Sequence, residues 1–418
     1  MTLCVQSCPA TDRPRQKRTA SVSNEIPLSL PDINEDDIRA VADTMRSGRL
    51  SIGPKLEEFE RLVARRAQRT YGVGVSSGTA GLHLALKALG VKPGDEVITP
   101  AFSFVASANC ILYAGAKPVF VDCDPRSLNM TVEAVEAKIT ERTRAIIAVE
   151  VFGNPANMID LAQLAGRYEI PFIEDACEGL GGRAGRDPIG KFGRVAVFGF
   201  YPNKQITTGE GGMIVTNDDH IARMCRCLRN QGRSVGHKPT DAIPGSELGT
   251  WFSHECIGFN YRLTEMQAAL GVSQMNRLDE LIERRQRVAE SYTRRLASNP
   301  DVIVPTVEPD VFMSWFVYVV RLNDRFTADD RNTIIEGLRR HDVGAAAYFP
   351  VIPLLPAYQR EFGFRPGDFP IAETVSERTI ALPMFTRLTE REIDLVCQTL
   401  EVMLQRASFT REAIGKRP

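Results

Sequence analysis

Between residues 71 and 216 the sequence alternates short β-rich runs with helical stretches, and few folds accommodate this pattern. The β-rich runs are almost continuously apolar, which is typical of strands buried on both faces. Helices between successive strands favour parallel pairing, because a parallel connection must cross the sheet. We therefore predict an α/β fold with a mostly parallel sheet. Its expected strands are 73–75, 97–98, 118–121, 145–151, 171–173, 195–200 and 212–215, and its expected helices are 80–89, 103–113, 131–139 and 158–168.

The second half of the sequence predicts a smaller α+β unit. It contains a long helical stretch at 264–296, a strand at 316–322, helices at 331–340 and 389–405, and a Pro-rich loop at 350–356. We place a large cofactor-binding domain at 25–270 and a small domain at 271–405, with tails at 1–24 and 406–418. The segment 236–249 is interpreted as a flexible surface loop. The arginines at 284–287 are interpreted as a solvated helix face, with an anion contact as the alternative.

The charge balance argues against a polyanionic partner. Lys plus Arg (51) nearly cancels Asp plus Glu (52), so no overall field favours nucleic acid or an acidic membrane. No stretch reaches the roughly 18 apolar residues that cross a bilayer. Nine cysteines without a disulfide framework, and an N-terminus without a secretory pattern, predict a cytoplasmic protein. The close pairs Cys225/Cys227 and His254/Cys256 lack a second pair at zinc-like spacing, so we expect no metal and favour a small-molecule ligand.

Lys204 is one of only ten lysines, and it stands between an expected strand and a Gly-rich turn. A lysine in this place can project into the crevice where α/β sheets bind their ligands. A buried amine loses its proton more readily than a solvated one, and a Schiff-base lysine needs that property. The ordinary alternative is a solvated loop lysine.

The run Ile173-Glu174-Asp175 is an apolar strand that ends in two acids. A carboxylate at the end of a strand can pair with the protonated nitrogen of a heterocycle and hold that ring as an electron sink. For Asp175 alone, an acid in a turn is the alternative. One expected strand separates Asp175 from Lys204, so both belong to neighbouring strand ends.

Two further strand ends carry suitable residues. Ser77, Gly78 and Thr79 open an expected helix, whose free amides can bind a phosphate, although a plain N-cap at Ser77 is the alternative. The glycine spacing there does not match a dinucleotide fingerprint. Phe104 can stack on a flat ring or pack in the core. Together the strand ends supply an imine former, a pyridinium partner, a phosphate cradle and a stacking face, which are the parts that pyridoxal phosphate requires.

Longer motifs point to a known family. They occupy residues 47–54, 77–80, 94–98, 174–176, 203–212, 228–232 and 258–264. On these motifs, the chain from about residue 26 to 404 resembles the DegT/DnrJ/EryC1/StrS family of nucleotide-sugar aminotransferases. The resemblance implies the fold type I, aspartate-aminotransferase-like architecture, a homodimer with shared active sites, and pyridoxal 5'-phosphate bound as an imine to Lys204.

The resemblance also assigns roles to single residues on the cofactor side of the site. By position, Gly78 and Thr79 would hold the phosphate, Phe104 would stack on the pyridine ring, and Asp175 would meet the ring nitrogen. Lys204 and Asp175 would be the catalytic residues.

Other residues are assigned near the substrate or the dimer interface. Glu178 would lie near the ring hydroxyl and the substrate. Asn260, together with Arg262, would reach the phosphate across the dimer interface, and Arg262 and Phe349 would also approach the substrate.

Two positions depart from the commonest family pattern. Gly199 stands where many members have a phosphate-binding serine, so that anchor would be missing or replaced by water. Ile352 stands where many members have a histidine beside the sugar, so the usual substrate contact is in doubt.

The resemblance implies transamination, because sugar dehydratases of the family have a histidine in place of Lys204. L-glutamate would give its amino group through the cofactor to a keto group of a nucleotide-linked deoxysugar, while Lys204 moves the Cα proton. The run 203–212 most resembles 4-amino sugar synthases of the perosamine type, which implies amination at C4. The alternatives are a C3-specific aminotransferase, another fold type I reaction, and a regulatory protein that binds the cofactor without turnover.

Overall fold

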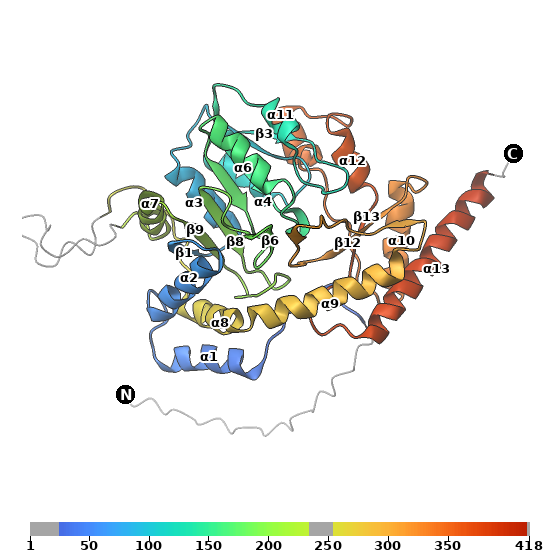
Figure 1. Ribbon diagram of the computed structural model, residues 1–418, viewed down its shortest axis with the longest axis horizontal. Coiled ribbons are helices and arrows are strands. Elements are labelled where there is room, and N and C mark those ends of the chain that lie inside the picture. Colours follow the sequence, from blue (N-terminus) through green and yellow to red (C-terminus); the bar gives the residue numbers. More distant parts are fainter. Residues whose placement is uncertain (1–24, 234–253, 416–418) are drawn as a thin grey trace, which may run out of the picture.

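A seven-stranded sheet lies at the centre of the computed structural model, which describes residues 25–233 and 254–415 (Figure 1). The strand order is β1-β9-β8-β5-β4-β2-β3. All neighbours pair in parallel except β9, which runs antiparallel to both β8 and β1. The predicted mostly parallel α/β sheet is confirmed. Its strands are β1 (Tyr71–Val75), β2 (Glu96–Pro100), β3 (Lys117–Val121), β4 (Thr143–Val149), β5 (Phe172–Asp175), β8 (Val195–Gly199) and β9 (Gly212–Thr216).

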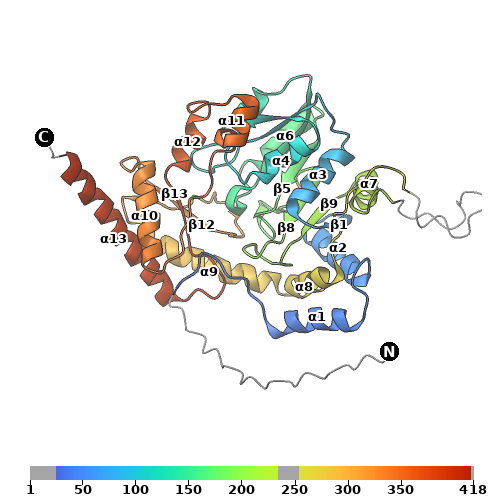
Figure 2. The ribbon, with the colours of Figure 1, turned by 180° about the vertical axis from the view of Figure 1, so that it is seen from behind.

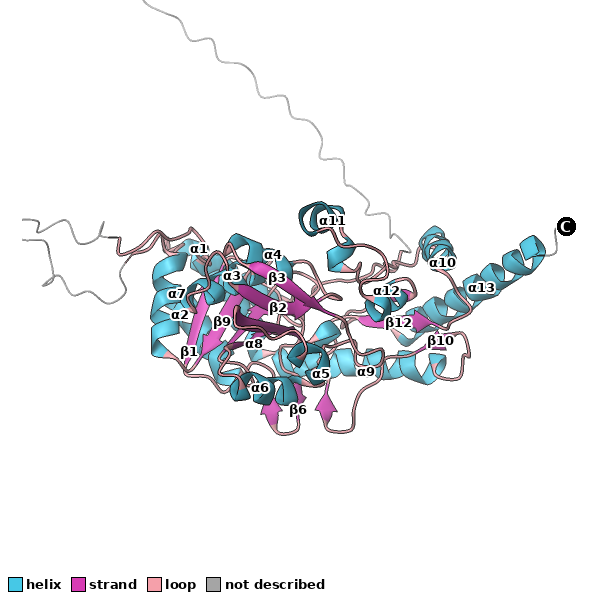
Figure 3. Ribbon diagram, turned by 90° about the horizontal axis from the view of Figure 1, so that it is seen from above, coloured by secondary structure: helices cyan, strands magenta, loops and turns pink. Residues whose placement is uncertain are grey.

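Helices cover both faces of this sheet (Figure 3), because successive side chains of a strand point to opposite faces. Val195 and Val197 of β8 pack in one apolar cluster, and Ala196 and Phe198 pack in another. The first cluster includes α3 (Gly78–Ala88), α4 (Ala106–Tyr113) and α7 (Asp219–Arg229). The second includes α2 (Pro54–Arg66) and α8 (Glu265–Asn276), and a third lies under α5 (Val132–Glu136) and α6 (Met158–Arg167).

The stretch 264–296, expected as one helix, is two helices, so that prediction is wrong. α8 begins at a capping box in which Thr264 and Gln267 bond each other's backbone, and it ends at Asn276. Arg277 leaves the helical conformation at φ −111° and ψ 6°, and α9 (Leu278–Leu296) begins directly after it. In Figure 1 α9 runs from the large sheet towards the C-terminal part of the molecule.

The C-terminal part contains a small antiparallel sheet with helices around it (Figure 2). The sequence predicted β12, α10 and the start of α13, but α13 continues to Gly415, past the expected end. It did not predict α1 (Glu35–Arg46), α2, α7 or several short elements. The C-terminal elements are β10 (Val302–Ile303), β12 (Tyr318–Leu322), β13 (Thr379–Leu382), α10 (Ala328–Arg340), α11 (Pro356–Phe362), α12 (Pro370–Ser376) and α13 (Glu390–Gly415); β6 (Arg183–Ala184), β7 (Asp187–Pro188) and β11 (Val311–Phe312) form a third sheet.

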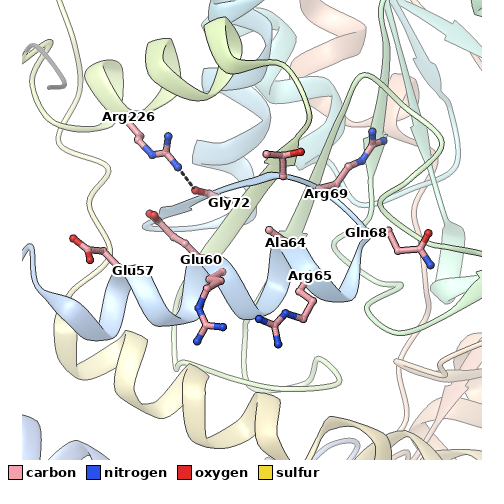
Figure 4. Close-up of a pocket in the computed structure, with 10 residues that line it drawn as sticks. Glu57, Glu60, Ala64, Arg65, Gln68, Arg69, Gly72 and Arg226 are labelled. Carbon is pink, nitrogen blue, oxygen red and sulfur yellow. Dashed lines mark hydrogen bonds between the residues drawn. The ribbon is translucent and has the colours of Figure 1, made fainter.

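Side chains occupy the outer edge of β1. The Gly72 carbonyl accepts a 3.0 Å bond from Arg226 Nη2 (Figure 4), and the Gly74 carbonyl accepts a 2.6 Å bond from Arg229 Nη1. The Gly74 amide donates to Glu60 Oε1 at 2.9 Å. A hollow of about 740 Å³ lies beside this edge, between α2 and α7. Side chains therefore satisfy three of the backbone groups that an edge strand usually leaves open.

The expected tail at 1–24 and most of the expected loop at 236–249 lie outside the described residues. Within the described ranges, no helix combines the length and the apolar character needed to cross a membrane. The same ranges contain no group of three or more His, Cys, Asp or Glu side chains placed to hold a metal ion.

Candidate active site

Residues from separate strand ends meet beyond the carboxyl edge of the large sheet. A Cβ atom added at Gly78, where α3 begins, would lie 2.5 Å from the Sγ atom of Cys177. The Cys177 amide donates to Asp175 at the end of β5. Lys204, in the turn after β8, lies beside Glu178. The structure therefore brings Gly78, Asp175, Glu178 and Lys204 together in one place, as the sequence predicted for the first, second and last of these.

The Lys204 side chain is largely enclosed, with 14% of its surface exposed. Its Nζ atom lies 3.7 Å from Glu178 Oε1 and 3.9 Å from the centre of the Phe316 ring. Its backbone amide donates to the Tyr201 carbonyl at 3.0 Å, which closes the turn. The amine is thus held between an acid and an aromatic face, and it is not a solvated loop lysine.

Asp175 is buried, and its bonds come from Cys177. Its recorded backbone bond, from the Cys177 amide to Oδ1, is 3.4 Å long. Burial raises the pKa of Asp175 above its ordinary value, although bonds with Cys177 and the charge of Lys204 oppose the shift. Glu174 points to the other face, where it accepts bonds from the Gly190 and Gly193 amides. Of the two strand-ending acids, Asp175 is the one beside Lys204.

Glu178 is also buried, and it joins the lysine to the neighbouring loop. Oε2 accepts a 2.8 Å bond from the Phe152 amide. Burial raises the pKa of Glu178 to about 7, against the opposing effects of Lys204 and the Phe152 amide. At neutral pH this carboxyl is therefore able both to hold and to release a proton.

The turn before α3 has the geometry of a phosphate cradle and of a helix cap. Ser77 is the N-cap, and its hydroxyl accepts a 3.1 Å bond from the Ala80 amide. A side chain at Gly78 would collide with Cys177, so the backbone stays open at this point. Thr79 is half-buried in the first turn. The cap and the anion site are compatible, because a cap satisfies only part of the free amides of a helix.

The Gly199 departure has a structural reason. A Cβ atom at Gly199 would lie 3.3 Å from both Cβ and Sγ of Cys177, so the thiol occupies the space next to this position. Glycine at 199 and cysteine at 177 therefore complement each other.

An aromatic group forms one wall of the site. Phe104 keeps 57% of its surface exposed, which is unusual for a phenylalanine and leaves a ring face free to stack. Phe349 packs against Phe152 at 5.3 Å and is only 7% exposed, so it contributes mainly as part of the wall. Ile352 is fully buried and offers no polar group to a sugar.

Asn260 and Arg262 lie on a segment that runs beside the end of β1. Arg262 forms a bridge with Val75 and donates to Asn230 Oδ1 at 3.0 Å. Asn260 is exposed. The structure does not join either residue to Lys204 within one chain.

Two buried charged residues were missed by the sequence analysis. Arg285 is 2% exposed, so the interpretation of 284–287 as a solvated face is wrong at this position. The available signal was helical spacing, since Ile282, Arg285, Ala289 and Tyr292 all lie on the buried side of α9. Glu150 follows β4 and is fully buried, and burial beside Glu174 and Asp175 raises its pKa well above the ordinary value.

These residues fit pyridoxal phosphate. A buried acid lies near the enclosed lysine, Phe104 presents an exposed ring, and α3 begins at Gly78, which has no side chain to cover its amide. Fold and site together define a pyridoxal-phosphate-dependent enzyme of fold type I.

Comparison with known proteins narrows this class. Residues 31–401 match the model of the DegT/DnrJ/EryC1/StrS aminotransferase family. The chain belongs to this family, and it is a sugar aminotransferase that uses pyridoxal phosphate.

Individual relatives match over nearly their whole length. The chain is 36% identical to the GDP-perosamine synthase of Caulobacter vibrioides, over 85% of this chain and 91% of the relative. It is 35% identical to a pleiotropic regulatory protein of Geobacillus stearothermophilus, over 87% and 93%. The PLP-form of Spr1654 from Streptococcus pneumoniae superimposes with a TM-score of 0.85 at 28% identity, over 92% of this chain and 99% of that one.

Proposed function

We propose that the protein transfers the amino group of L-glutamate to the keto group at C4 of a nucleotide-linked deoxysugar. The observation that carries the proposal is the position of the Lys204 amine. It is enclosed, it lies beside Glu178, and it follows the strand next to the one that ends in Asp175. The similarity to a GDP-perosamine synthase supports a nucleotide sugar and the C4 position. The described cysteines are all free, which supports a cytoplasmic location.

The residues of the site would divide the work of holding the cofactor. Lys204 would attach it covalently, and Gly78 and Thr79 would bind its phosphate at the start of α3. Phe104 would stack on the ring, and Asp175 would hold the proton of the ring nitrogen. When bound, pyridoxal phosphate supplies a conjugated ring that accepts the electron pair left when the Cα proton of the donor departs.

The chain's own groups would move the protons. The Lys204 amine would take the Cα proton of glutamate and later return a proton to the sugar carbon. Glu178 lies 3.7 Å from that amine, and its pKa of about 7 allows it to take up and release a proton at neutral pH. Phe316, which is 2% exposed, covers the amine and limits access of water.

A second copy of the chain would complete the site. Asn260 is exposed and Arg262 half-buried, beside β1 rather than beside Lys204 of the same chain, so both are available to a partner. We propose a homodimer in which these two residues reach the partner's phosphate or substrate. Glu178 and Phe349 would border the substrate within one chain.

The test is a product assay. Purified protein is incubated with ¹⁵N-glutamate and a panel of nucleotide-linked keto sugars, and products are identified by mass spectrometry and NMR. We expect ¹⁵N at C4 of one sugar and an equal amount of 2-oxoglutarate, with no transfer by Lys204→Ala. Label at C3 would contradict the C4 position, and amination of free but not nucleotide-linked sugars would contradict the substrate class.

The relative named as a pleiotropic regulatory protein gives a second candidate, a protein that binds the cofactor without turnover. The same assay separates the two. A protein that binds pyridoxal phosphate at Lys204 but forms no 2-oxoglutarate from glutamate would support the regulatory function.

A further inference from the structure

The guanidinium of Arg285 is buried among backbone carbonyls. From Nη1 it donates to the carbonyls of Trp315 and Phe316, both at 3.2 Å. From Nη2 it donates to the Lys204 carbonyl at 2.8 Å and to the Asn203 carbonyl at 3.4 Å. One side chain of α9 thus reaches the turn that carries Lys204 and the segment that leads into β12.

This cation has no acid beside it. Among the described residues, no carboxylate lies within ion-pair distance of Arg285, whereas Arg277, also near the start of α9, meets both Asp32 and Asp37. Burial lowers the pKa of Arg285 to about 10, so the group remains charged at neutral pH. A buried charge is costly unless its surroundings compensate it, and here the compensation comes from carbonyl dipoles and from the more distant charge of Asp32. An apolar side chain would fit this stripe of α9 without that cost.

The two segments that Arg285 joins are the ones that place the Lys204 amine. The guanidinium holds the main chain of Lys204 at one end of the side chain. At the other end, the ring of Phe316 lies 3.9 Å from Nζ, and the Phe316 carbonyl is bonded to the same guanidinium. The backbone around Lys204 is a turn without helix or strand bonds, so its position depends on tertiary contacts, of which Gln205 supplies some, to Glu178 and Ser314, and Arg285 supplies others.

We propose that Arg285 is a positioning residue for Lys204, which fixes the turn of the lysine and the Phe316 ring relative to each other so that the amine stays aimed at the cofactor. The proposal rests on Lys204 as the attachment point of the proposed function. Misplacement of a reacting group by about 1 Å can lower a rate about 10²-fold, so an anchor of this kind has a measurable effect.

The experiment compares Arg285→Met with Arg331→Met in the full-length holoenzyme. Arg331 is a matched control, because it is a partly buried helix arginine that donates to a backbone carbonyl, that of Ser376, in the C-terminal part. Three quantities are measured: the visible circular dichroism of bound cofactor, the rate at which pyridoxal phosphate is linked to Lys204 in cofactor-free protein, and kcat and KM for glutamate.

We expect Arg285→Met to lower kcat about 10²-fold with little change in KM, to slow the linkage, and to weaken the circular dichroism per bound cofactor. Arg285→Lys, which keeps the charge but loses the forked geometry, should fall between this variant and the wild type. Arg331→Met should lower stability only. A circular dichroism, linkage rate and kcat like those of Arg331→Met would overturn the proposal. If Arg285→Met does not fold, Arg285→Lys decides by the same criteria.

Borohydride reduction and peptide mapping separate this proposal from the proposed function. If the reduced cofactor is found on Lys204 in the wild type, Lys204 is the attachment point, whatever the Arg285 variants show. If the reduced cofactor is found on another lysine, both proposals are overturned.

Discussion

Two buried groups of charges in this molecule are built in opposite ways. Around Asp32, before α1, the carboxylate accepts bonds from Thr386 at 2.6 Å and Arg387 at 3.1 Å and pairs with Arg277 at 3.4 Å. Burial alone would raise the pKa of Asp32, but these partners outweigh burial and lower it. Around Lys204, burial prevails and raises the pKa of both Asp175 and Glu178.

The difference shows how a structural acid and a site acid can be told apart. Asp32 is surrounded by hydrogen-bond donors, so its charged form stabilises the folded state. Asp175 receives a long bond from the Cys177 amide and another from the Cys177 side chain, but burial outweighs these bonds and the charge of Lys204, so a further donor would stabilise its charged form. A protonated ring nitrogen is such a donor.

Removal of the cation of each group should give the largest contrast. Lys204→Ala should lower amino transfer about 10⁴-fold or more, because the lysine both attaches the cofactor and moves protons. Arg277→Met should leave turnover per folded molecule within about threefold of wild type, yet lower the free energy of unfolding by about 3 kcal/mol, because Asp32 and Asp37 lose a buried partner. Steady-state assays and urea titrations test both, and turnover by Lys204→Ala would show that another amine is used.

Neutralising one acid in each group should have opposite effects on stability. Asp175→Asn should lower kcat on the order of 10²-fold, since the ring nitrogen loses its ionic partner. The cofactor-free variant should be at least as stable as wild type, because a buried acid whose pKa is raised by burial is removed. Asp32→Asn should keep its activity and lose about 2 kcal/mol of stability. Urea unfolding measures both stabilities. Equal losses in the two variants would contradict the distinction between Asp32 as a structural acid and Asp175 as a site acid.

The pH dependence of stability should also differ between the groups. The folded pKa of Glu178, about 7, lies above its unfolded value, so the folded state binds more protons between roughly pH 4 and 7 and stability falls as pH rises through that window. Glu178→Gln should remove up to about 3 kcal/mol of this fall in cofactor-free protein. Asp32 has a lowered pKa, so its contribution is present at neutral pH and is lost only in acid. Urea titrations from pH 5 to 8 measure the slope, and an unchanged slope in Glu178→Gln would contradict the assignment.

The smallest effect is expected at Gly199. A serine there would press on Cys177, which lies 3.3 Å from the added Cβ, so Gly199→Ser should weaken cofactor binding a few-fold. In a Cys177→Ala background the serine keeps the contact with Cβ of residue 177 but loses the contact with Sγ, so its effect on cofactor binding should be smaller. Equilibrium dialysis of pyridoxal phosphate gives both affinities. Identical effects in the two backgrounds would mean that the thiol does not exclude the serine.

The strand ends of the site could be predicted from sequence because the signals are local. The near-continuous apolar runs marked β5 and β8, and the residues directly after such runs must lie at the carboxyl edge of the sheet. That reasoning was sufficient for Asp175 and Lys204, which lie at neighbouring strands.

The residues that could not be predicted depend on tertiary contacts. The break at Arg277 coincides with bonds to Asp32 and Asp37, which are more than two hundred residues away in sequence. Arg285 lies within a run of arginines, and the composition of that run indicated a solvent-exposed face. Only the position of Arg285 on the helix indicated burial. Glu178 came from family resemblance rather than from spacing, because its bond to Phe152 depends on the loop after β4.

The occupied edge of β1 limits how copies of the chain can associate. Glu60, Arg226 and Arg229 already bond the Gly72 carbonyl and both backbone groups of Gly74, which a strand from another molecule would need. A second copy therefore cannot lengthen the sheet on this side without displacing three polar side chains. The same arrangement protects this edge from fibrous aggregation.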